Sequence, residues 1–306
     1  MKNITIFVIL ACLLFPFAAL EGAGDMPLAP EPDTVAVQRT QAGVVENTEL
    51  RDYLVGVLFA EMPHTYEKEA LKAQVVCAHT LMLYRKETQD KSYDITDSSM
   101  SDQGYLDETA AKAKYGGKYE EARAIFAAAV DEVISVTLTY EGEICLSTYH
   151  DISAGKTETA SVMWGGEYPY LTAVESVGDL LSPDYLSGKK FTESELLAAL
   201  GLKESDEGIG EIQRSQSGTV TDIELFGAEF TGAEIRKKLE LKSANFDVEK
   251  DENEYVFTVR GHGHCVGMSQ YGANYMAALG SSYEEILQWY FKGVKTINDE
   301  QLTIND

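Results

Sequence analysis

Residues 49–63, ELRDYLVGVLFAEMP, decide how the first half of this chain is interpreted. Apolar side chains recur at helical spacing up to a proline, so the stretch predicts a helix over Glu49–Met62 with Asn47 or Thr48 as its cap. Glu61 lies at the next step of the same apolar face. Burial there would raise the pKa of its carboxyl group, as a general acid working near neutral pH requires. A helix-end glutamate that caps a loop amide or pairs with an arginine is the structural alternative, and the helical pattern alone favours it.

The rest of the chain predicts a mixture of helices and strands. Helical periodicity predicts a second helix over Tyr66–Glu87 and a third over Tyr119–Val133. Alternating apolar residues joined at Glu141-Gly142 predict a β-hairpin. Shorter patterns predict capping boxes at Thr192 with Glu195 and Thr231 with Glu234, strands over Val220–Phe226 and Tyr255–Arg260, and a helix over Ser269–Leu279. Because these elements show no regular βαβ alternation, we expect one large α+β domain with a substrate groove.

The composition excludes one class of partner. The 306 residues carry 50 Asp plus Glu against 25 Lys plus Arg, which gives a net charge of −25. This charge repels phosphate backbones, so we expect no nucleic acid partner. Hydrophobic residues make up 44% of the chain, which is enough for a packed core.

The first residues are typical of a segment that directs export. Ile4–Leu20 carries no charge and follows Lys2, as in a signal peptide or a membrane anchor. Prolines in the next stretch indicate a linker. We therefore expect a signal peptide or anchor helix over residues 1–21, a linker over residues 22–46 and the folded domain over residues 47–298. The domain would lie outside the cytoplasm, anchored to the cell membrane, or secreted if the leader is cleaved.

A glycine-rich stretch, GHGHCVGMSQYG over residues 261–272, is the second candidate for a site. Its glycines let the backbone approach a ligand closely, and its imidazole, hydroxyl and amide groups suit a sugar. A purely structural turn is the alternative. His262 and His264 could bind zinc, but we expect no metal ion there. Cys265 beside His264 has the chemistry of a thiol nucleophile, although a buried structural cysteine is the commoner case and no third orienting group is apparent.

Two further clusters combine polar and aromatic residues. One runs over Tyr149–Thr157 and is followed by Trp164–Tyr170. Such groups line saccharide grooves by stacking on sugar faces and bonding hydroxyls, and the aromatic residues fit a core equally well. The other cluster, Thr96–Tyr105, has the composition of a solvent-exposed turn.

In this order, the segments resemble the stage II sporulation protein D family of peptidoglycan lytic transglycosylases. The resemblance runs from Asn47 to Val294. It rests on YLVGV at residues 53–57, Glu61-Met62-Pro63, Glu69–Gln74, Gln103-x-Tyr105, Ser153-x-Gly155-x-Thr157-Glu158, Trp164–Glu167 and Gly263–Ala273. The family implies an exported, membrane-anchored enzyme that cuts glycan strands during engulfment in sporulation.

The resemblance implies that Glu61 is the catalytic acid. Lytic transglycosylases need a single carboxyl group, because the nucleophile is a hydroxyl of the same sugar. Glu61 would protonate the glycosidic oxygen between N-acetylmuramic acid and N-acetylglucosamine and then accept the proton of the muramyl C6 hydroxyl, which leaves a 1,6-anhydro end. The candidates for substrate binding are Gln103, Tyr105, His264, Ser269, Gln270, Tyr271, Ser153, Lys156 and His79. No cofactor is implied.

The chain departs from the family pattern at three places. His79 stands where the family usually has Arg, so a group that titrates near neutrality replaces a permanent charge. Some members hold a metal before Gln-x-Tyr, but Asp97, Ser101 and Asp102 are a poor zinc set, so we expect no metal. Cys265 stands where Gly is usual. The cysteines outside the leader, among which one disulfide is possible, are Cys77, Cys145 and Cys265.

A second function comes from a different class. The family's domain also occurs in amidase enhancers, which bind the cell wall and stimulate another hydrolase. The loss of the usual Arg at His79 favours this alternative, whereas the intact Glu-Met-Pro favours the enzyme. The expected partners are peptidoglycan glycan strands, the cytoplasmic membrane through the N-terminal segment, and a cell-wall amidase with other engulfment proteins.

Overall fold

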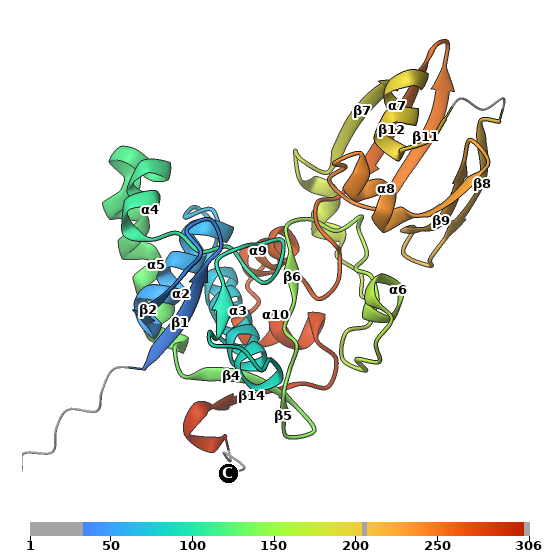
Figure 1. Cartoon of the computed structure of the whole chain (residues 1–306). Helices are drawn as coiled ribbons and strands as arrows, with labels where there is room; N and C mark the ends of the chain where they lie inside the picture. The colour runs from blue at the N-terminus through green and yellow to red at the C-terminus, as the bar shows by residue number, and fades with distance from the viewer. Residues whose placement is uncertain (1–32, 204–206, 303–306) are drawn as a thin grey trace, which may run out of the picture. The chain divides into compact units, whose positions relative to one another are not determined.

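The computed structural model describes residues 33–203 and 207–302. The expected leader, residues 1–21, and the first part of the expected linker lie outside the described residues. From Val35 on, the described residues form one compact unit of mixed helices and strands (Figure 1). None of the helices in these described ranges is both long and apolar enough to cross a membrane.

Three helices form the centre of the larger hydrophobic core: α2 (Leu50–Glu61), α3 (Lys68–Thr88) and α5 (Tyr119–Val133). They contact one another, and Figure 1 shows α2, α3 and α5 in the same part of the molecule. The sequence predicted all three within two residues at each end. Helix α3 is buried on several faces because α5, two later helices and a sheet all contact it.

The predicted hairpin forms the edge of a three-stranded sheet. Strand β4 (Val136–Tyr140) pairs antiparallel with β5 (Glu143–Ile144), and β14 (Lys295–Asn298) pairs with the other edge of β4. Glu141 and Gly142 both have positive φ, 54° and 96°. A two-residue hairpin turn of this kind matches the twist of its strands, which is why the local sequence sufficed to predict it.

The expected linker boundary was wrong. Strands β1 (Thr34–Arg39) and β2 (Val44–Glu49) occupy residues that we expected to lie in the linker, and β1 also pairs with β3 (Ile95–Thr96). Alternate residues Val35 and Val37 are buried in the core, so the folded part begins before residue 47. The prolines that indicated a linker all precede β1.

The expected cap of α2 was also wrong. The N-cap is Glu49, and its side chain makes no capping hydrogen bond. Strand β2 ends at this residue and leads directly into the helix, so neither Asn47 nor Thr48 reaches the capping position.

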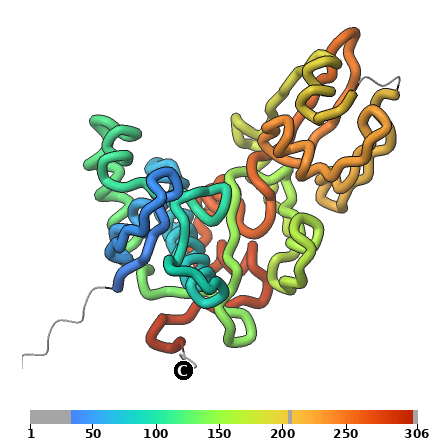
Figure 2. Tube along the Cα trace, in the orientation of Figure 1, coloured from blue at the N-terminus to red at the C-terminus, as the bar shows by residue number. Residues whose placement is uncertain are grey.

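Residues 186–260 carry a second hydrophobic cluster, which we call the lobe (Figure 2, yellow to orange). The lobe holds two antiparallel three-stranded sheets, in the orders β10-β9-β8 and β11-β12-β7. Its elements are β7 (Leu186–Thr192), α7 (Glu193–Leu200), β8 (Ile209–Arg214), β9 (Val220–Leu225), β10 (Ala228–Thr231), α8 (Gly232–Lys238), β11 (Phe246–Asp251) and β12 (Glu254–Arg260). Both predicted capping boxes form, one at the start of α7 and one at the start of α8.

The chain enters and leaves the lobe at adjacent points. The N–H of Gly261, which follows β12, donates to the carbonyl of Tyr185, which precedes β7, at 2.8 Å. The lobe is therefore an insertion between two segments that both belong to the larger core. The single expected α+β domain thus contains two hydrophobic clusters rather than one.

A short parallel pairing brings two of the sequence motifs together. Strand β6 (Tyr149–His150) pairs with β13 (Met268–Ser269), so the Tyr149–Thr157 cluster lies against the glycine-rich stretch. Helix α9 (Gln270–Ala278) follows immediately, with Ser269 as its N-cap. The remaining elements are α4 (Glu108–Tyr115), η1 (Gly116–Lys118), α6 (Ala160–Trp164), η2 (Val177–Leu181), α10 (Tyr283–Tyr290) and η3 (Asp299–Gln301).

Candidate functional site

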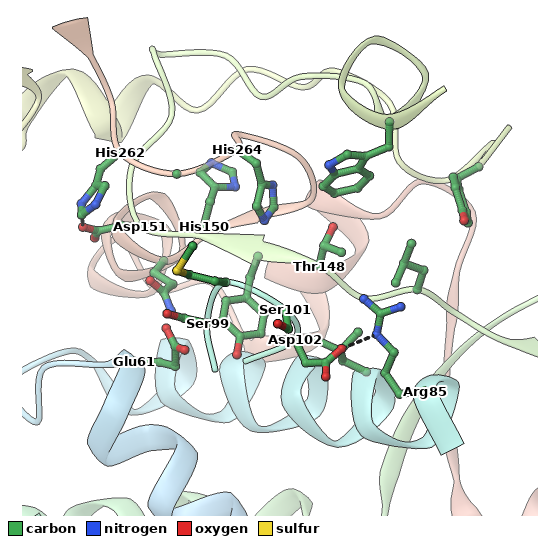
Figure 3. A pocket seen from close by; sticks show the side chains of 18 of the residues that line it. Glu61, Arg85, Ser99, Ser101, Asp102, Thr148, His150, Asp151, His262 and His264 are labelled. Carbon is green, nitrogen blue, oxygen red and sulfur yellow. Dashed lines mark hydrogen bonds and ion pairs between the residues drawn. The ribbon is translucent and has the colours of Figure 1, made fainter. Parts of the chain in front are cut away.

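A cavity of about 660 Å³ lies between the end of α2 and the glycine-rich stretch. Glu61 and Asp102 lie on one side of it, and His262, His150 and His264 lie in a row on the other side (Figure 3). Residues from α3, the Ser99–Asp102 loop, α6 and the lobe complete the wall. Most of these groups are polar and come from segments far apart in the sequence.

Glu61 is the last residue of α2 and is partly buried at the cavity wall. The backbone N–H of Gly104 donates to its Oε1 at 2.5 Å. Burial raises the pKa of the Glu61 carboxyl above its ordinary value, although the Gly104 hydrogen bond, the charge of Lys114 and a hydrogen bond with Gln270 oppose the rise. Lys114 is held nearby because its Nζ donates to the carbonyl of Phe59 at 2.9 Å. The fold thus shifts Glu61 towards its protonated form relative to an exposed glutamate.

The other two carboxylates at the cavity each contact a basic side chain. Asp151 Oδ2 lies 2.8 Å from Nδ1 of His262. Asp102 lies 2.9 Å from Nε of Arg85 and also accepts from the N–H and Oγ1 of Thr96, at 3.0 and 2.8 Å. Among the described residues that line the cavity, Glu61 is therefore the carboxylate without a direct basic partner.

His150 and His264 are held in fixed, neutral forms. Nδ1 of His150 lies 3.2 Å from the carbonyl of Val266, which can only accept, so this nitrogen carries the proton. Nδ1 of His264 accepts from the N–H of Val266 at 3.1 Å, so its proton lies on Nε2. Burial lowers the pKa of His150 to about 3 and that of His264 to about 4. Both rings are uncharged at neutral pH, and the Trp164 ring lies 5.1 Å from that of His264.

Three of the predicted site residues lie at the cavity: Glu61, His264 and Gln270. Gln270 is buried, and its Nε2 lies 3.3 Å from Oε1 of Gln74 on α3, so it is held between that helix and Glu61. These three residues come from two motifs more than 200 positions apart, so both motifs contribute to the lining of one cavity.

The structure places Gln103 and Tyr105 in the core instead of at the cavity. Gln103 is buried and donates to the Tyr53 hydroxyl at 2.6 Å, while the Tyr149 hydroxyl donates to its Oε1 at 2.9 Å. Tyr105 is stacked on Tyr53 with ring centroids 5.4 Å apart. The Gln103 amide and the Tyr105 ring tie α2 to the chain before α4, which leaves the backbone at Gly104 facing Glu61.

Ser153 and Ser269 are also structural. Both hydroxyl groups donate to the buried carboxylate of Asp179, at 2.5 and 2.7 Å, and the N–H of Ser153 donates to it at 2.8 Å. Burial raises the pKa of Asp179 although these hydrogen bonds oppose the rise. Asp179 lies in η2, outside every motif that the sequence analysis singled out, so no local signal could have identified it.

The last three candidates lie away from the cavity lining. Lys156 forms an ion pair with Glu175 at 3.6 Å, and the hydroxyl of Tyr271 donates to the carbonyl of Leu181 at 3.4 Å. His79 is buried in α3, with Nδ1 3.8 Å from a carboxylate oxygen of Asp299. His79 thus occupies a core position instead of the cavity wall.

Within the described ranges, no group of three or more His, Cys, Asp and Glu side chains has the geometry to hold a metal ion. Cys77, Cys145 and Cys265 are buried and free, so the bridge that the sequence left open does not form among them. Burial raises the pKa of Cys265 to about 12, which is unsuited to a thiol nucleophile. Cys265 also has φ of 64°, in the left-handed region that glycine adopts most readily.

Two residues of the site escaped the sequence analysis. Gly104 lies inside the Gln103-x-Tyr105 motif as its unspecified residue, and its contribution is a backbone N–H that no side-chain pattern can indicate. Arg236 lines the cavity from α8 of the lobe, but in the sequence it begins a basic run, RKK, typical of a solvated helix end.

Comparisons with known proteins agree on one family. The family model described as "Stage II sporulation protein" matches residues 38–140. Stage II sporulation protein D of Bacillus subtilis (strain 168) is 34% identical over 278 residues, which cover 89% of this chain and 81% of that protein. The protein of the same name from Bacillus amyloliquefaciens is 32% identical, over 95% of this chain and 92% of that protein. A protein named amidase enhancer, also from Bacillus subtilis (strain 168), is 27% identical over 78% of this chain and 39% of its own length.

Proposed function

Because this chain belongs to the stage II sporulation protein D family, we propose that it is a lytic transglycosylase that cuts the glycan strands of peptidoglycan. The bond cleaved is that between N-acetylmuramic acid and N-acetylglucosamine. The muramyl product carries a 1,6-anhydro ring, in keeping with an enzyme that uses one carboxyl group.

The observation that carries this proposal is the environment of Glu61. Burial favours its protonated form, and Gly104 fixes its orientation through Oε1. In the first step, the Glu61 carboxyl donates its proton to the glycosidic oxygen while the bond from that oxygen to the muramyl C1 breaks. In the second step, the resulting carboxylate accepts the proton of the C6 hydroxyl while O6 bonds to C1. Glu61 thus regains the proton that it donated, and neither water nor a second carboxylate takes part in the proton transfers.

Other groups that line the cavity suit a sugar ligand. Trp164 is 47% exposed and offers a flat apolar face on which a sugar ring can stack. Gln270 offers an amide beside Glu61. Asp151 lies close enough for its charge to raise the pKa of Glu61 further, and a negative charge there would stabilise a positively charged oxocarbenium-like transition state.

Location and partners form a separate part of the proposal. We propose that residues 1–21 export the chain and anchor it to the cytoplasmic membrane, and that it acts in the engulfment stage of sporulation beside a cell-wall amidase. The similarity to a protein named amidase enhancer favours the alternative of a non-catalytic wall-binding protein that stimulates the amidase.

The deciding experiment compares the full chain with its Glu61→Gln variant on purified glycan strands, with mass spectrometry of the product ends. We expect 1,6-anhydromuramyl ends from the wild type and a loss of turnover of about 10²-fold or more in the variant. Glu49→Gln is the matched control, because Glu49 is exposed at the other end of α2 and should tolerate the change. Reducing muramyl ends would mean hydrolysis instead, with Asp151 as the carboxylate to test next. A folded wild type that binds glycan without cutting it would support the amidase-enhancer function.

A further inference from the structure

Arg236 is a cation without a counterion at the cavity. It lies on α8 of the lobe but lines the same cavity as Glu61 and His264. Among the described residues, its guanidinium makes no hydrogen bond and no ion pair. Arg39, Arg85, Arg214 and Arg260, in contrast, each contact at least one carboxylate. Arg123 also makes no ion pair among the described residues, but it is exposed to solvent on α5, whereas Arg236 lines the cavity.

No described group beside Arg236 carries a negative charge that pairs with its guanidinium. Burial lowers the pKa of Arg236, so the site holds a partly desolvated cation. The neighbouring His264 and His150 are neutral at neutral pH, and the charge of Arg236 lowers the pKa of both rings further. Elsewhere on the cavity wall, Arg85 contacts Asp102 and His262 contacts Asp151. Arg236 is therefore the uncompensated positive charge among the described cavity residues.

A hydrogen-bond acceptor lies close to this cation. Nε2 of His150 is buried and has no partner among the described residues, while Nδ1 of the same ring carries the proton. A buried polar atom without a partner costs free energy, and a ligand N–H or O–H would satisfy it. Trp164 and His264 form the adjacent aromatic wall. This end of the cavity thus offers a positive charge, an acceptor and a flat apolar face.

We propose that Arg236 binds a carboxylate carried by the glycan and is a specificity-determining residue. This inference rests on the proposed function, because it assigns the substrate of the same cavity. A guanidinium presents two parallel N–H groups that match the two oxygens of a carboxylate. In peptidoglycan this carboxylate belongs either to the lactyl ether of a muramic acid without peptide or to a stem peptide. A sugar carrying neither group leaves Arg236 unpaired.

The test measures ligand binding by the full chain in the Glu61→Gln background, where no turnover interferes. The ligands are a peptide-free muramyl oligosaccharide, the same oligosaccharide with its carboxylates reduced to alcohols, a peptide-bearing muramyl oligosaccharide, and a chitin oligosaccharide. In the same background, Arg236→Gln is compared with Lys237→Gln, which removes the neighbouring exposed charge outside the cavity.

We expect Arg236→Gln to weaken binding of a carboxylate-bearing glycan by about 10- to 100-fold, the usual scale for a hydrogen bond to a charged group. Binding of the reduced and chitin oligosaccharides should change little, and Arg236→Lys should restore part of the affinity. An effect confined to the peptide-free ligand identifies the lactyl carboxylate, whereas an effect confined to the peptide-bearing ligand identifies the peptide.

Equal losses for all four ligands, or no loss for either carboxylate-bearing ligand, would overturn the assignment. A separate result would contradict the proposed function without contradicting the assignment of Arg236. If the wild type releases no anhydro ends while Arg236→Gln still weakens only carboxylate-bearing ligands, the carboxylate site stands and the transglycosylase does not.

Discussion

Gly104 lies so close to the Glu61 carboxylate that a side chain at residue 104 would collide with it. The N–H of Gly104 donates to Oε1 of Glu61 at 2.5 Å, and a Cβ built on Gly104 would lie only 2.7 Å from that same oxygen. It would also lie 3.1 Å from the Cβ of Ala60, so the carboxylate has to move if a side chain is added. Glycine therefore fits position 104, because the Glu61 carboxylate accepts from the N–H of this residue and occupies the space that a side chain would take.

Gly104→Ala should therefore impair chemistry more than folding. The methyl group displaces the Glu61 carboxylate, and a displacement of about 1 Å of a catalytic group can cost on the order of 10²-fold in rate. Gly117→Ala is the matched control, because nothing lies within 4 Å of a Cβ there. Rates of anhydro-end release and melting temperatures of both variants check this. An active Gly104→Ala protein would show that the orientation of Glu61 is not limiting.

The pH dependence of activity should follow the pKa of Glu61. The protonated form is the acid, so the rate falls as pH rises through this pKa, which burial holds above its ordinary value. The charge of Lys114 lowers the same pKa, so Lys114→Gln should raise it and move the alkaline limb of the kcat/KM profile to higher pH. Lys112→Gln, on the same helix but paired with Glu108, is the control. A limb that moves to lower pH, or does not move, would contradict Glu61 as the acid.

His150 and His264 should make the fold sensitive to acid. Their pKa values in the folded protein, about 3 and about 4, lie below the ordinary histidine value of 6.5. The unfolded chain therefore binds protons that the folded one does not, and the stability present above pH 6.5 is lost progressively as pH falls towards 4 and below. Each ring contributes up to about 1.4 kcal/mol per pH unit in that window.

Urea unfolding at several pH values, with the wild type and His150→Asn, tests this dependence. The asparagine amide can replace Nδ1 as donor to the Val266 carbonyl but does not titrate. The free energy of unfolding of the variant should fall less steeply between pH 6.5 and 4, while the two proteins should show parallel curves above pH 7. Equal slopes throughout would mean that His150 is not held neutral by the fold.

Removal of β1 and β2 should destabilise the domain. A chain that begins at Asn47 lacks Val35 and Val37, which are buried, and leaves Asp94 without the Ala36 N–H that donates to it at 2.8 Å. Two buried valines alone account for about 3 kcal/mol or more. A chain that begins at Asp33 is the comparison, and denaturant titration measures the difference. Equal stability of the two chains would show that β1 and β2 do not stabilise the domain.

Local patterns were sufficient for several helices and turns of this fold, although α4 and α10 were not predicted. The α5 boundaries, the Glu141-Gly142 turn and the capping box at Thr192 each depend on residues close together in sequence. Strand β1 was missed because a six-residue segment carries little periodic signal of its own, and β3, one of its two partners, lies more than 50 positions away.

The site residues also fall into those that the sequence could identify and those that needed the tertiary structure. Glu61 and Gln270 were identified because each lies in a motif and also faces the cavity. Gln103 and Ser153 lie in motifs as well, but their side chains satisfy other buried polar groups, and sequence cannot tell a polar residue that faces a ligand from one that faces the core. Arg236 needed the tertiary structure, because it reaches the cavity from a separate hydrophobic cluster.

The hydrogen bond between Gly261 and Tyr185 has a consequence for how such a protein can change over generations. Because the lobe begins and ends at one point, insertions, deletions or substitutions between residues 186 and 260 need not separate the two ends of the remaining chain. Glu61 and its supports lie in the remaining chain, whereas Arg236 lies in the lobe. Selection can therefore act on which wall polymer is held without disturbing the acid that cuts it, and descendants adapted to different walls should differ most within this one inserted segment.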